Sequence, residues 1–341
     1  MGALLELEHL SVSFDTPKGE VQAVRDVSLT VREGEILALV GESGCGKTVM
    51  SQSVLKLLPG NSRIKSGKIL VDGTDITDYK EKDMRNLRGT TLSMVFQDPM
   101  TTLNPTMPVG KQIMEAVLKH ERVSREEAKR RAVEMLDLVG IEDAEHRYML
   151  QPHYFSGGMR QRCVLAIALA LKPRLLFADE PTTALDVTVQ AKILDLLLKL
   201  KNKLGLSIVF ISHDLGVVAK IADRVAVMYA GKLVEVGKAE EVFYDPRHPY
   251  TWGLLSALPS LAKKGEGLKC IPGMPPMLLD PPKGDAFAVR NEFALAIDYE
   301  EMPPMFQVSP THSAATWLLD KRAPKIQPPQ IFREERAANE R

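Results

Sequence analysis

The sequence predicts an α/β fold with a mostly parallel sheet, because short apolar runs alternate with longer runs that have helical spacing. The expected strands cover residues 35–40, 92–96, 175–178, 207–211 and 224–228. They are apolar along their whole length, as strands covered on both faces of a parallel sheet should be. Between two of these strands, five apolar residues recur at helical spacing: Ile193, Leu194, Leu197, Leu200 and Leu204.

Residues 98–154 interrupt this alternation with a pattern that is helical throughout. Within it, Ser124 followed three positions later by Glu127 predicts a capping box at the start of a charged, amphipathic helix. We therefore expect a helical subdomain at about residues 98–170.

Proline becomes frequent after about residue 246, which predicts a small, loop-rich C-terminal extension. We expect one domain over residues 1–250 and the extension over residues 251–341. The charged residues 333–341 are expected to fray.

Composition excludes several function classes. The 44 basic and 44 acidic residues give a formal net charge of zero, so no nucleic-acid partner is expected. Cys45, Cys163 and Cys270 lie far apart and lack metal-ligand spacing, which favours reduced thiols. The N-terminus has neither a signal-peptide nor a myristoylation pattern, and no apolar run approaches about 18 residues, so we expect no membrane span.

A glycine-rich loop follows the first expected parallel strand and precedes a helix, which is the context of a phosphate-binding loop. Its residues are Gly41, Glu42, Ser43, Gly44, Cys45, Gly46, Lys47 and Thr48. The glycines let backbone N–H groups turn inward, and the helix directs its positive end at the phosphates. Lys47 adds a charge for the β- and γ-phosphates, and the Thr48 hydroxyl suits Mg²⁺. A chance glycine-rich turn is the weaker alternative.

Two acids, Asp179 and Glu180, follow the expected strand 175–178. Alone, such acids would more often cap a helix. Together with residues 41–48, they predict that Asp179 holds Mg²⁺ and that Glu180 polarises the attacking water as general base.

Residues 155–162 read Phe-Ser-Gly-Gly-Met-Arg-Gln-Arg and resemble the signature motif of ATP-binding cassette (ABC) ATPases. Ser156, Gly157 and Gly158 at a helix start form a second anion cradle. Because residues 41–48 already serve one side of a nucleotide, this cradle implies a second chain. The alternative is a simple helix cap.

The resemblance covers about residues 4–245 and implies a RecA-like P-loop core with a β-subdomain and a helical subdomain, acting on ATP with Mg²⁺. Gln97 resembles the glutamine that bridges Mg²⁺ and the membrane partner. Asp186 resembles the dimer-seam aspartate, and His213 the histidine that contacts the γ-phosphate. Phe14 occupies the position of an aromatic that stacks on adenine, although it could equally belong to the core. Phe155 and Met159 depart from the usual signature.

Three stretches resemble the peptide and nickel importer branch: residues 95–105, 247–251 and 271–276. This resemblance implies an ATP-hydrolysing subunit that powers oligopeptide import at the cytoplasmic face of the membrane. Its expected partners are a second ABC ATPase subunit, usually a paralogue, two membrane-spanning permease subunits and an extracytoplasmic oligopeptide-binding protein. A dipeptide or nickel importer, an exporter, a non-transport ABC ATPase and a cassette that does not hydrolyse ATP remain alternatives.

Some relatives hold an iron–sulfur cluster in the extension with four cysteines. The matching positions here are Asp285, Asn291, Asp298 and Thr316. None is a thiolate, so no iron–sulfur cluster is expected. The retained residues Phe287, Arg290 and Trp317 suggest that the extension folds without metal. Asp285 and Asp298 could bind a hard cation, but we expect solvated loop acids.

Overall fold

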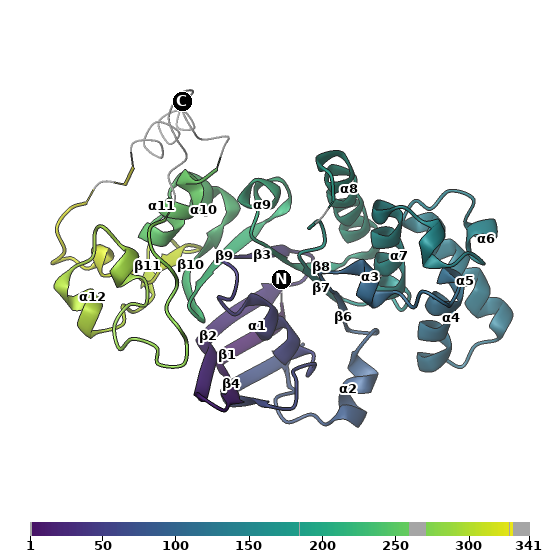
Figure 1. The fold of residues 1–341 in the computed structure, drawn as a ribbon, viewed down its shortest axis with the longest axis horizontal. Coiled ribbons are helices and arrows are strands. Elements are labelled where there is room, and N and C mark those ends of the chain that lie inside the picture. Colours follow the sequence, from purple (N-terminus) through teal and green to yellow (C-terminus); the bar gives the residue numbers. More distant parts are fainter. Residues whose placement is uncertain (1, 184, 259–270, 327, 330–341) are drawn as a thin grey trace. The chain divides into compact units, whose positions relative to one another are not determined.

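The computed structural model describes residues 2–183, 185–258, 271–326 and 328–329 (Figure 1). Cys270, Ala184 and the expected frayed end lie outside these residues. The chain forms two compact units, which we describe separately. The first comprises Met1–Leu4, Val31–Glu35 and Asp78–Ile211, and the second Leu5–Thr30, Ile36–Thr77 and Ser212–Arg341.

The first unit contains three parallel strands, β6 (Leu92–Val95), β7 (Leu175–Asp179) and β8 (Ser207–Ser212), with β7 paired to both others. Every residue of β7 and β8 is buried, which confirms the expected apolar strands. Helix α8 (Val187–Leu204) lies between β7 and β8 in the chain and buries four of the five predicted positions. Leu204 is only half-buried.

Residues 98–154 are helical, as predicted. They form α3 (Pro99–Thr102), α4 (Val109–His120), α5 (Arg125–Leu138), α6 (Ala144–Arg147) and the 3₁₀ turn η1 (Pro152–Tyr154), and the next helices are α7 (Gly157–Leu169) and α8. Helices α4, α5 and α7 pack together in the first unit (Figure 1). The short helix α2 (Glu81–Leu87) precedes β6.

The capping box at α5 is half present. Ser124 Oγ accepts a hydrogen bond from the Glu127 N–H at 3.1 Å, as expected. The Glu127 carboxylate instead pairs with Arg130 and Arg131 on the next turn. These hydrogen bonds lower the pKa of Glu127 to about 2. Two nearby guanidinium groups therefore outcompete the backbone for this side chain.

The second unit contains an antiparallel sheet whose strands were not among those predicted from the sequence. It comprises β1 (Ala3–Thr16), β2 (Gly19–Arg32), β4 (Ser62–Val71) and β5 (Thr74–Asp75), in the order β2-β1-β4-β5. These strands are half exposed and therefore lack the continuous apolar runs that predicted the parallel strands. Only the family resemblance implied a β-subdomain.

A further set of strands in the second unit carries the phosphate loop. Strand β3 (Ile36–Val40) pairs in parallel with β9 (Arg224–Tyr229), which pairs antiparallel with β10 (Lys232–Lys238). Two short strands of the extension, β12 (Ser313–Ala314) and β11 (Phe306–Gln307), continue from β10. The extension is thus hydrogen-bonded into the same strands that lead to the loop.

The remaining helical elements of the second unit are α1 (Lys47–Val54), α9 (Leu215–Ile221), α10 (Ala239–Tyr244), α11 (Pro249–Ser256), η2 (Ala288–Arg290), α12 (Ala296–Glu300) and η3 (Trp317–Leu319). Helix α11 spans the expected boundary between residues 250 and 251, and that division stays a prediction.

Candidate nucleotide-binding and hydrolysis site

The phosphate loop connects β3 to α1 and requires glycine at two close backbone approaches. A Cβ at Gly41 would lie 2.1 Å from the Met228 carbonyl oxygen, and one at Gly46 would lie 2.4 Å from that of Ala23. Gly41 and Gly46 also have φ angles of 151° and 106°, which side chains with a Cβ rarely adopt. The loop geometry is therefore fixed by glycine, as the motif predicts.

Lys47 opens α1 and is buried, with its ammonium inside the loop. Its Nζ donates hydrogen bonds to the carbonyl oxygens of Gly41 at 2.7 Å and Glu42 at 2.9 Å. The adjacent Cys45 thiol is also buried, and loss of solvent raises its pKa. Burial likewise raises the pKa of Cys163 to about 12, so neither thiol is poised as a thiolate.

Asp179 ends β7 and is buried, whereas Glu180 is half-buried and has a left-handed backbone with φ of 46°. Its carboxylate accepts hydrogen bonds from Gln97 Nε2 and Thr183 Oγ1, both at 2.9 Å. A non-glycine residue in this conformation is strained and persists only where its surroundings hold it. The structure thus brings Gln97 and Glu180 together. The strained backbone of Glu180 and its hydrogen bonds fix the orientation of its carboxylate.

The signature residues begin α7. Ser156 Oγ accepts from the Met159 N–H at 3.4 Å, and Ser156 and Gly157 are exposed. A Cβ at Gly158 would lie 2.5 Å from Val189 Cγ1 on α8. Asp186 caps α8 by accepting from the Val189 N–H at 2.9 Å. Capping roles are therefore present at both sites, and contact of either site with a second chain stays a prediction.

The predicted site residues are divided between the two units. The first unit holds Gln97, Ser156, Gly157, Gly158, Asp179, Glu180 and Asp186, and the second holds Phe14, residues 41–48 and His213. His213 is exposed directly after β8, and Phe14 on β1 is half-buried.

Sequence reasoning missed two residues that touch the phosphate loop. The Arg290 guanidinium pairs with both oxygens of the Glu42 carboxylate, at 2.6 and 2.9 Å. The Glu42 N–H donates to the Tyr250 hydroxyl at 2.8 Å. The hydrogen bonds to Glu42 raise the pKa of Arg290. Tyr250 lies in the stretch 247–251 that had marked the importer branch, so this contact gives that stretch a physical role.

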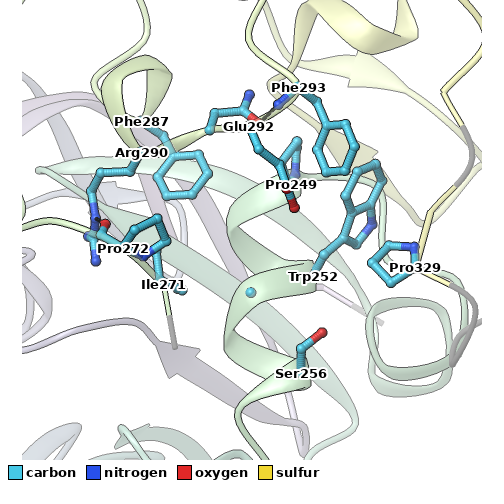
Figure 2. Close-up of a pocket in the computed structure, with 12 residues that line it drawn as sticks. Pro249, Trp252, Ser256, Ile271, Pro272, Phe287, Arg290, Glu292, Phe293 and Pro329 are labelled. Atoms are coloured by element: carbon cyan, nitrogen blue, oxygen red, sulfur yellow. Dashed lines mark hydrogen bonds between the residues drawn. The ribbon is translucent and has the colours of Figure 1, made fainter. Parts of the chain in front are cut away.

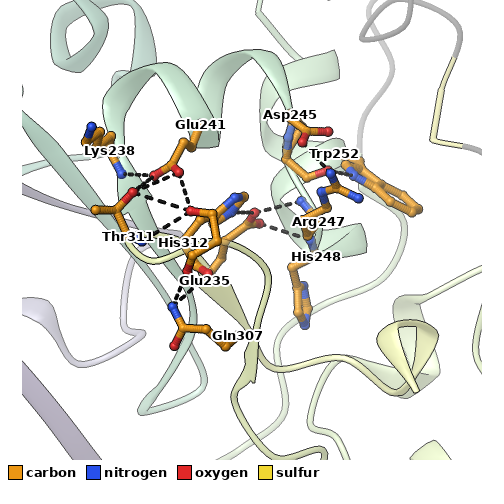
Figure 3. Close-up of polar contacts among 12 residues, drawn as sticks. Glu235, Lys238, Glu241, Asp245, Arg247, His248, Trp252, Gln307, Thr311 and His312 are labelled. Carbon is orange, nitrogen blue, oxygen red and sulfur yellow. Dashed lines mark hydrogen bonds and ion pairs between the residues drawn. The ribbon is translucent and has the colours of Figure 1, made fainter. Parts of the chain in front are cut away.

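A second missed feature is a buried polar cluster around Glu235 on β10 (Figure 3). Glu235 accepts from the N–H groups of Arg247 at 2.6 Å and His248 at 3.0 Å, and from His312 Nε2 at 2.7 Å. His248 is buried, which lowers its pKa to about 3 and keeps it neutral. Its Nδ1 accepts from the Tyr250 N–H at the start of α11. The cluster thereby joins β10, the start of α11 and the β12 hairpin.

The expectation of solvated acids in the extension is wrong. Asp285 and Asp298 are 6% and 1% exposed, and Asn291 and Thr316 are buried as well. Each of the four side chains accepts a hydrogen bond from a nearby backbone N–H, at Phe287, Phe293, Leu295 and Leu318. The polar side chains thus stabilise the loop turns directly.

Burial raises the pKa of Asp285 to about 6, and the neighbouring Asp298 adds to the shift. Burial also raises the pKa of Asp298. Among the described residues, no three His, Cys, Asp or Glu side chains are grouped so that they could hold a metal ion.

Three features together define the class of ATP-binding cassettes. They are the phosphate loop after the parallel strand β3, the acid pair at the end of the parallel strand β7, and the glycine-rich start of α7. The ABC transporter family model matches residues 24–183, and the model described as the oligopeptide/dipeptide transporter C-terminal region matches residues 234–297. The chain belongs to the ATP-binding subunits of ABC transporters, which hydrolyse ATP.

Several curated relatives are similar over nearly the whole chain. The oligopeptide transport ATP-binding protein OppD of Bacillus subtilis is 59% identical, covering 97% of this chain and 93% of the relative. The dipeptide transport ATP-binding protein DppD of Lactococcus lactis is 55% identical, covering 95% and 93%. AmiE of Streptococcus pneumoniae, an oligopeptide transport ATP-binding protein, is 51% identical, covering 96% and 93%.

Solved cassettes have the same fold. The dimeric post-hydrolysis ATP-binding cassette MJ0796, bound to ADP and Pi, has a TM-score of 0.62 and 27% identity, covering 69% of this chain and 98% of that cassette. The cassette cbiO1 from Clostridium perfringens has a TM-score of 0.63 and 28% identity, covering 72% and 92%. Within the described residues, no helix is both long and apolar enough to cross a membrane.

Proposed function

We propose that this chain powers the import of oligopeptides by hydrolysing ATP at the cytoplasmic face of a membrane transporter. The observation that carries the proposal is the joining of the extension to the phosphate-loop strands through β10, β12 and Arg290. The chain thus combines a complete set of cassette motifs with the C-terminal region found in oligopeptide and dipeptide transporters. The oligopeptide and dipeptide names of its relatives support a peptide substrate.

In this proposal, the phosphate loop binds the nucleotide through inward backbone N–H groups and the positive end of α1. The Lys47 ammonium donates hydrogen bonds to loop carbonyl oxygens in this structure. With nucleotide bound, it would donate to the β- and γ-phosphates instead. Phe14 would stack on the adenine. The Lys47 ammonium already lies inside the loop, so its contact requires only a shift of that side chain.

The oxygen donors of Thr48, Asp179 and Gln97 suit Mg²⁺, a hard cation that prefers oxygen ligands. When bound, Mg²⁺ would neutralise charge on the β- and γ-phosphates. Asp179 is buried at a strand end, where a carboxylate is favoured if it is paired with a cation.

Glu180 would accept a proton from the attacking water, and its bond from Gln97 Nε2 fixes the carboxylate for that task. His213 would contact the γ-phosphate. Ser156, Gly157, Gly158 and Asp186 would close on the nucleotide of a second ATPase subunit, so that hydrolysis opens the pair. The helices α3 to α7 would pass this motion to two permease subunits, which receive peptide from an extracytoplasmic binding protein.

The test is ATP hydrolysis by the membrane-assembled complex, with and without a peptide-loaded binding protein. We expect loaded peptide to stimulate turnover and Glu180→Gln to abolish the stimulated rate. Turnover that ignores every loaded peptide would contradict peptide import while leaving the ATPase assignment intact.

A dipeptide importer is the second candidate, because DppD of Lactococcus lactis, which is named for dipeptide transport, is 55% identical. Binding proteins loaded with peptides of two and of five residues separate the two candidates. Stimulation by the longer peptide supports oligopeptide import, whereas stimulation by dipeptides alone supports the alternative.

A further inference from the structure

We propose that Arg290 of the C-terminal extension is a positioning residue for the nucleotide: it neutralises Glu42 and sets the ATP affinity of the phosphate loop. The proposal rests on the proposed role of residues 41–48 in binding ATP. It assigns the extension a task in the nucleotide site of its own chain.

The geometry of Arg290 suits a rigid clamp. Its two terminal nitrogens contact the two Glu42 oxygens, and its Nε donates to the Pro272 carbonyl oxygen at 2.8 Å. One terminal nitrogen also reaches the Tyr229 hydroxyl at 3.3 Å. A planar guanidinium in such a fork has a single orientation, which the point charge of lysine cannot reproduce.

Aromatic rings hold the guanidinium from the sides. Its central carbon lies 5.7 Å from the ring centre of Tyr229 and 6.0 Å from that of Phe287. In Figure 2, Arg290 lies beside Phe287 and Pro272 at one wall of a pocket in the extension. The Arg290 side chain is 3% exposed and that of Glu42 is 29% exposed, so water reaches the pair only from the Glu42 side.

The charge on Glu42 explains why a clamp is needed. Glu42 is the second residue of a loop that would surround phosphates, and an unpaired carboxylate there would repel them. The pair with Arg290 cancels this charge, and the Tyr250 hydroxyl fixes the Glu42 backbone at the same time. Both contacts come from elements after residue 247, so the extension and α11 together fix the start of the loop at Glu42.

The turns of the extension place Arg290. It ends η2, between the turn closed by Asp285 on the Phe287 N–H and the turn closed by Asn291 on the Phe293 N–H. These buried side chains therefore hold the short segment that carries the guanidinium to the loop.

The experiment measures the affinity of the purified full-length chain for Mg-ATP by equilibrium dialysis. We expect Arg290→Gln to weaken binding about tenfold, because it leaves the Glu42 carboxylate unpaired beside the phosphates. The double variant Glu42→Gln with Arg290→Gln should recover to within about threefold of the original chain, because both charges are removed together. Arg322→Gln, which breaks an exposed pair with Asp320 in the same extension, is the matched control and should leave affinity unchanged.

A purely structural role of Arg290 predicts a different result: the double variant would bind no better than Arg290→Gln. That outcome, or unchanged affinity in a folded Arg290→Gln, would overturn the proposal. If Arg290→Gln does not fold, hydrogen exchange in the unmodified chain decides instead. Mg-ATP should slow exchange of the Phe287 and Arg290 amides, and unchanged exchange would contradict the coupling.

Lys47→Ala separates this proposal from the proposed function. If the original chain binds Mg-ATP and Lys47→Ala abolishes binding, residues 41–48 are the nucleotide loop, and the Arg290 results test only the clamp. If Lys47→Ala binds as the original chain does, the assignment of the loop fails first.

Discussion

The phosphate loop, residues 41–48, and the extension segment, residues 285–316, use polar groups in different ways. In the loop, glycines shape the backbone, and the buried Lys47 ammonium bonds carbonyl oxygens within five or six positions of itself. In the extension, buried side chains close the turns, and Arg290 and His312 reach partners far away in the chain. The loop is shaped by its glycine backbone, as we propose for ATP binding, whereas the extension is shaped by its own side chains.

This difference teaches where function and stability separate. A group kept for a ligand can be exchanged with little loss of stability where the replacement keeps its native hydrogen bonds, as glutamine does at Glu180. A buried group that satisfies several native donors cannot, because its removal strands them without water. The following predictions test that separation, beginning with the largest expected effect.

Glu180→Gln should lower ATP turnover by about a hundredfold to ten-thousandfold, because glutamine cannot accept the proton of the attacking water. The amide can still accept the hydrogen bonds from Gln97 and Thr183, so thermal stability and ATP affinity should hold. Single-turnover hydrolysis and a melting curve check both expectations. The exposed Asp195→Asn on α8 is the control, and a comparable loss of turnover there would remove the special role of Glu180.

Glu235→Ala should destabilise the fold by about 3 kcal/mol or more, because two buried donors and one part-buried donor lose their acceptor at once. Urea unfolding of the full chain measures the change. Glu240→Ala, at an exposed position on α10, should change the free energy of unfolding by less than about 0.5 kcal/mol. Equal effects at the two positions would show that the cluster contributes nothing to stability.

Asp285→Asn should stabilise the chain at pH 8 by up to about 3 kcal/mol. The folded pKa of Asp285 is raised from 3.8 to about 6, so ionisation opposes folding above that pH and not below 3.8. The advantage of the variant should therefore vanish as pH falls from about 6 to 4. Asparagine can still accept from the Phe287 N–H.

Unfolding by urea at pH 4, 6 and 8 measures this dependence. Asp320→Asn is the control of opposite sign, because hydrogen bonds from Arg322 lower the pKa of Asp320 to about 2. That variant should lose stability at neutral pH, because ionised Asp320 favours folding there. A pH-independent gain for Asp285→Asn would contradict the burial of a charged carboxylate there.

Sequence reasoning succeeded where a structural feature depends on neighbouring residues. The phosphate loop, the start of α7 at Ser156 and the buried strands β7 and β8 each follow from consecutive residues. It failed where partners lie far apart: Arg290 and Glu42 are 248 positions apart, and His312 and Glu235 are 77. The residues around Arg290 or His312 in the sequence do not indicate which distant carboxylate each side chain will contact.

The extension shows why burial was misjudged. Asp285 and Asp298 lie in a proline-rich stretch, where polar residues are usually exposed in loops. Packing of the β12 hairpin against β10 and of Phe287 against Tyr229 and Tyr250 encloses this stretch instead. Only the three-dimensional arrangement reveals that these acids lack water.

Ser124→Ala should have the smallest effect, a loss of about 1 kcal/mol, because the Ser124 hydroxyl satisfies one N–H at an exposed helix end. Urea unfolding measures it, with the exposed Ser66→Ala on β4 as control. Water can replace a hydroxyl at an exposed cap, but it cannot reach the donors around Glu235. Ser124→Ala should therefore cost clearly less than Glu235→Ala, and a cost equal to or above it would refute the distinction between locally encoded caps and the long-range cluster.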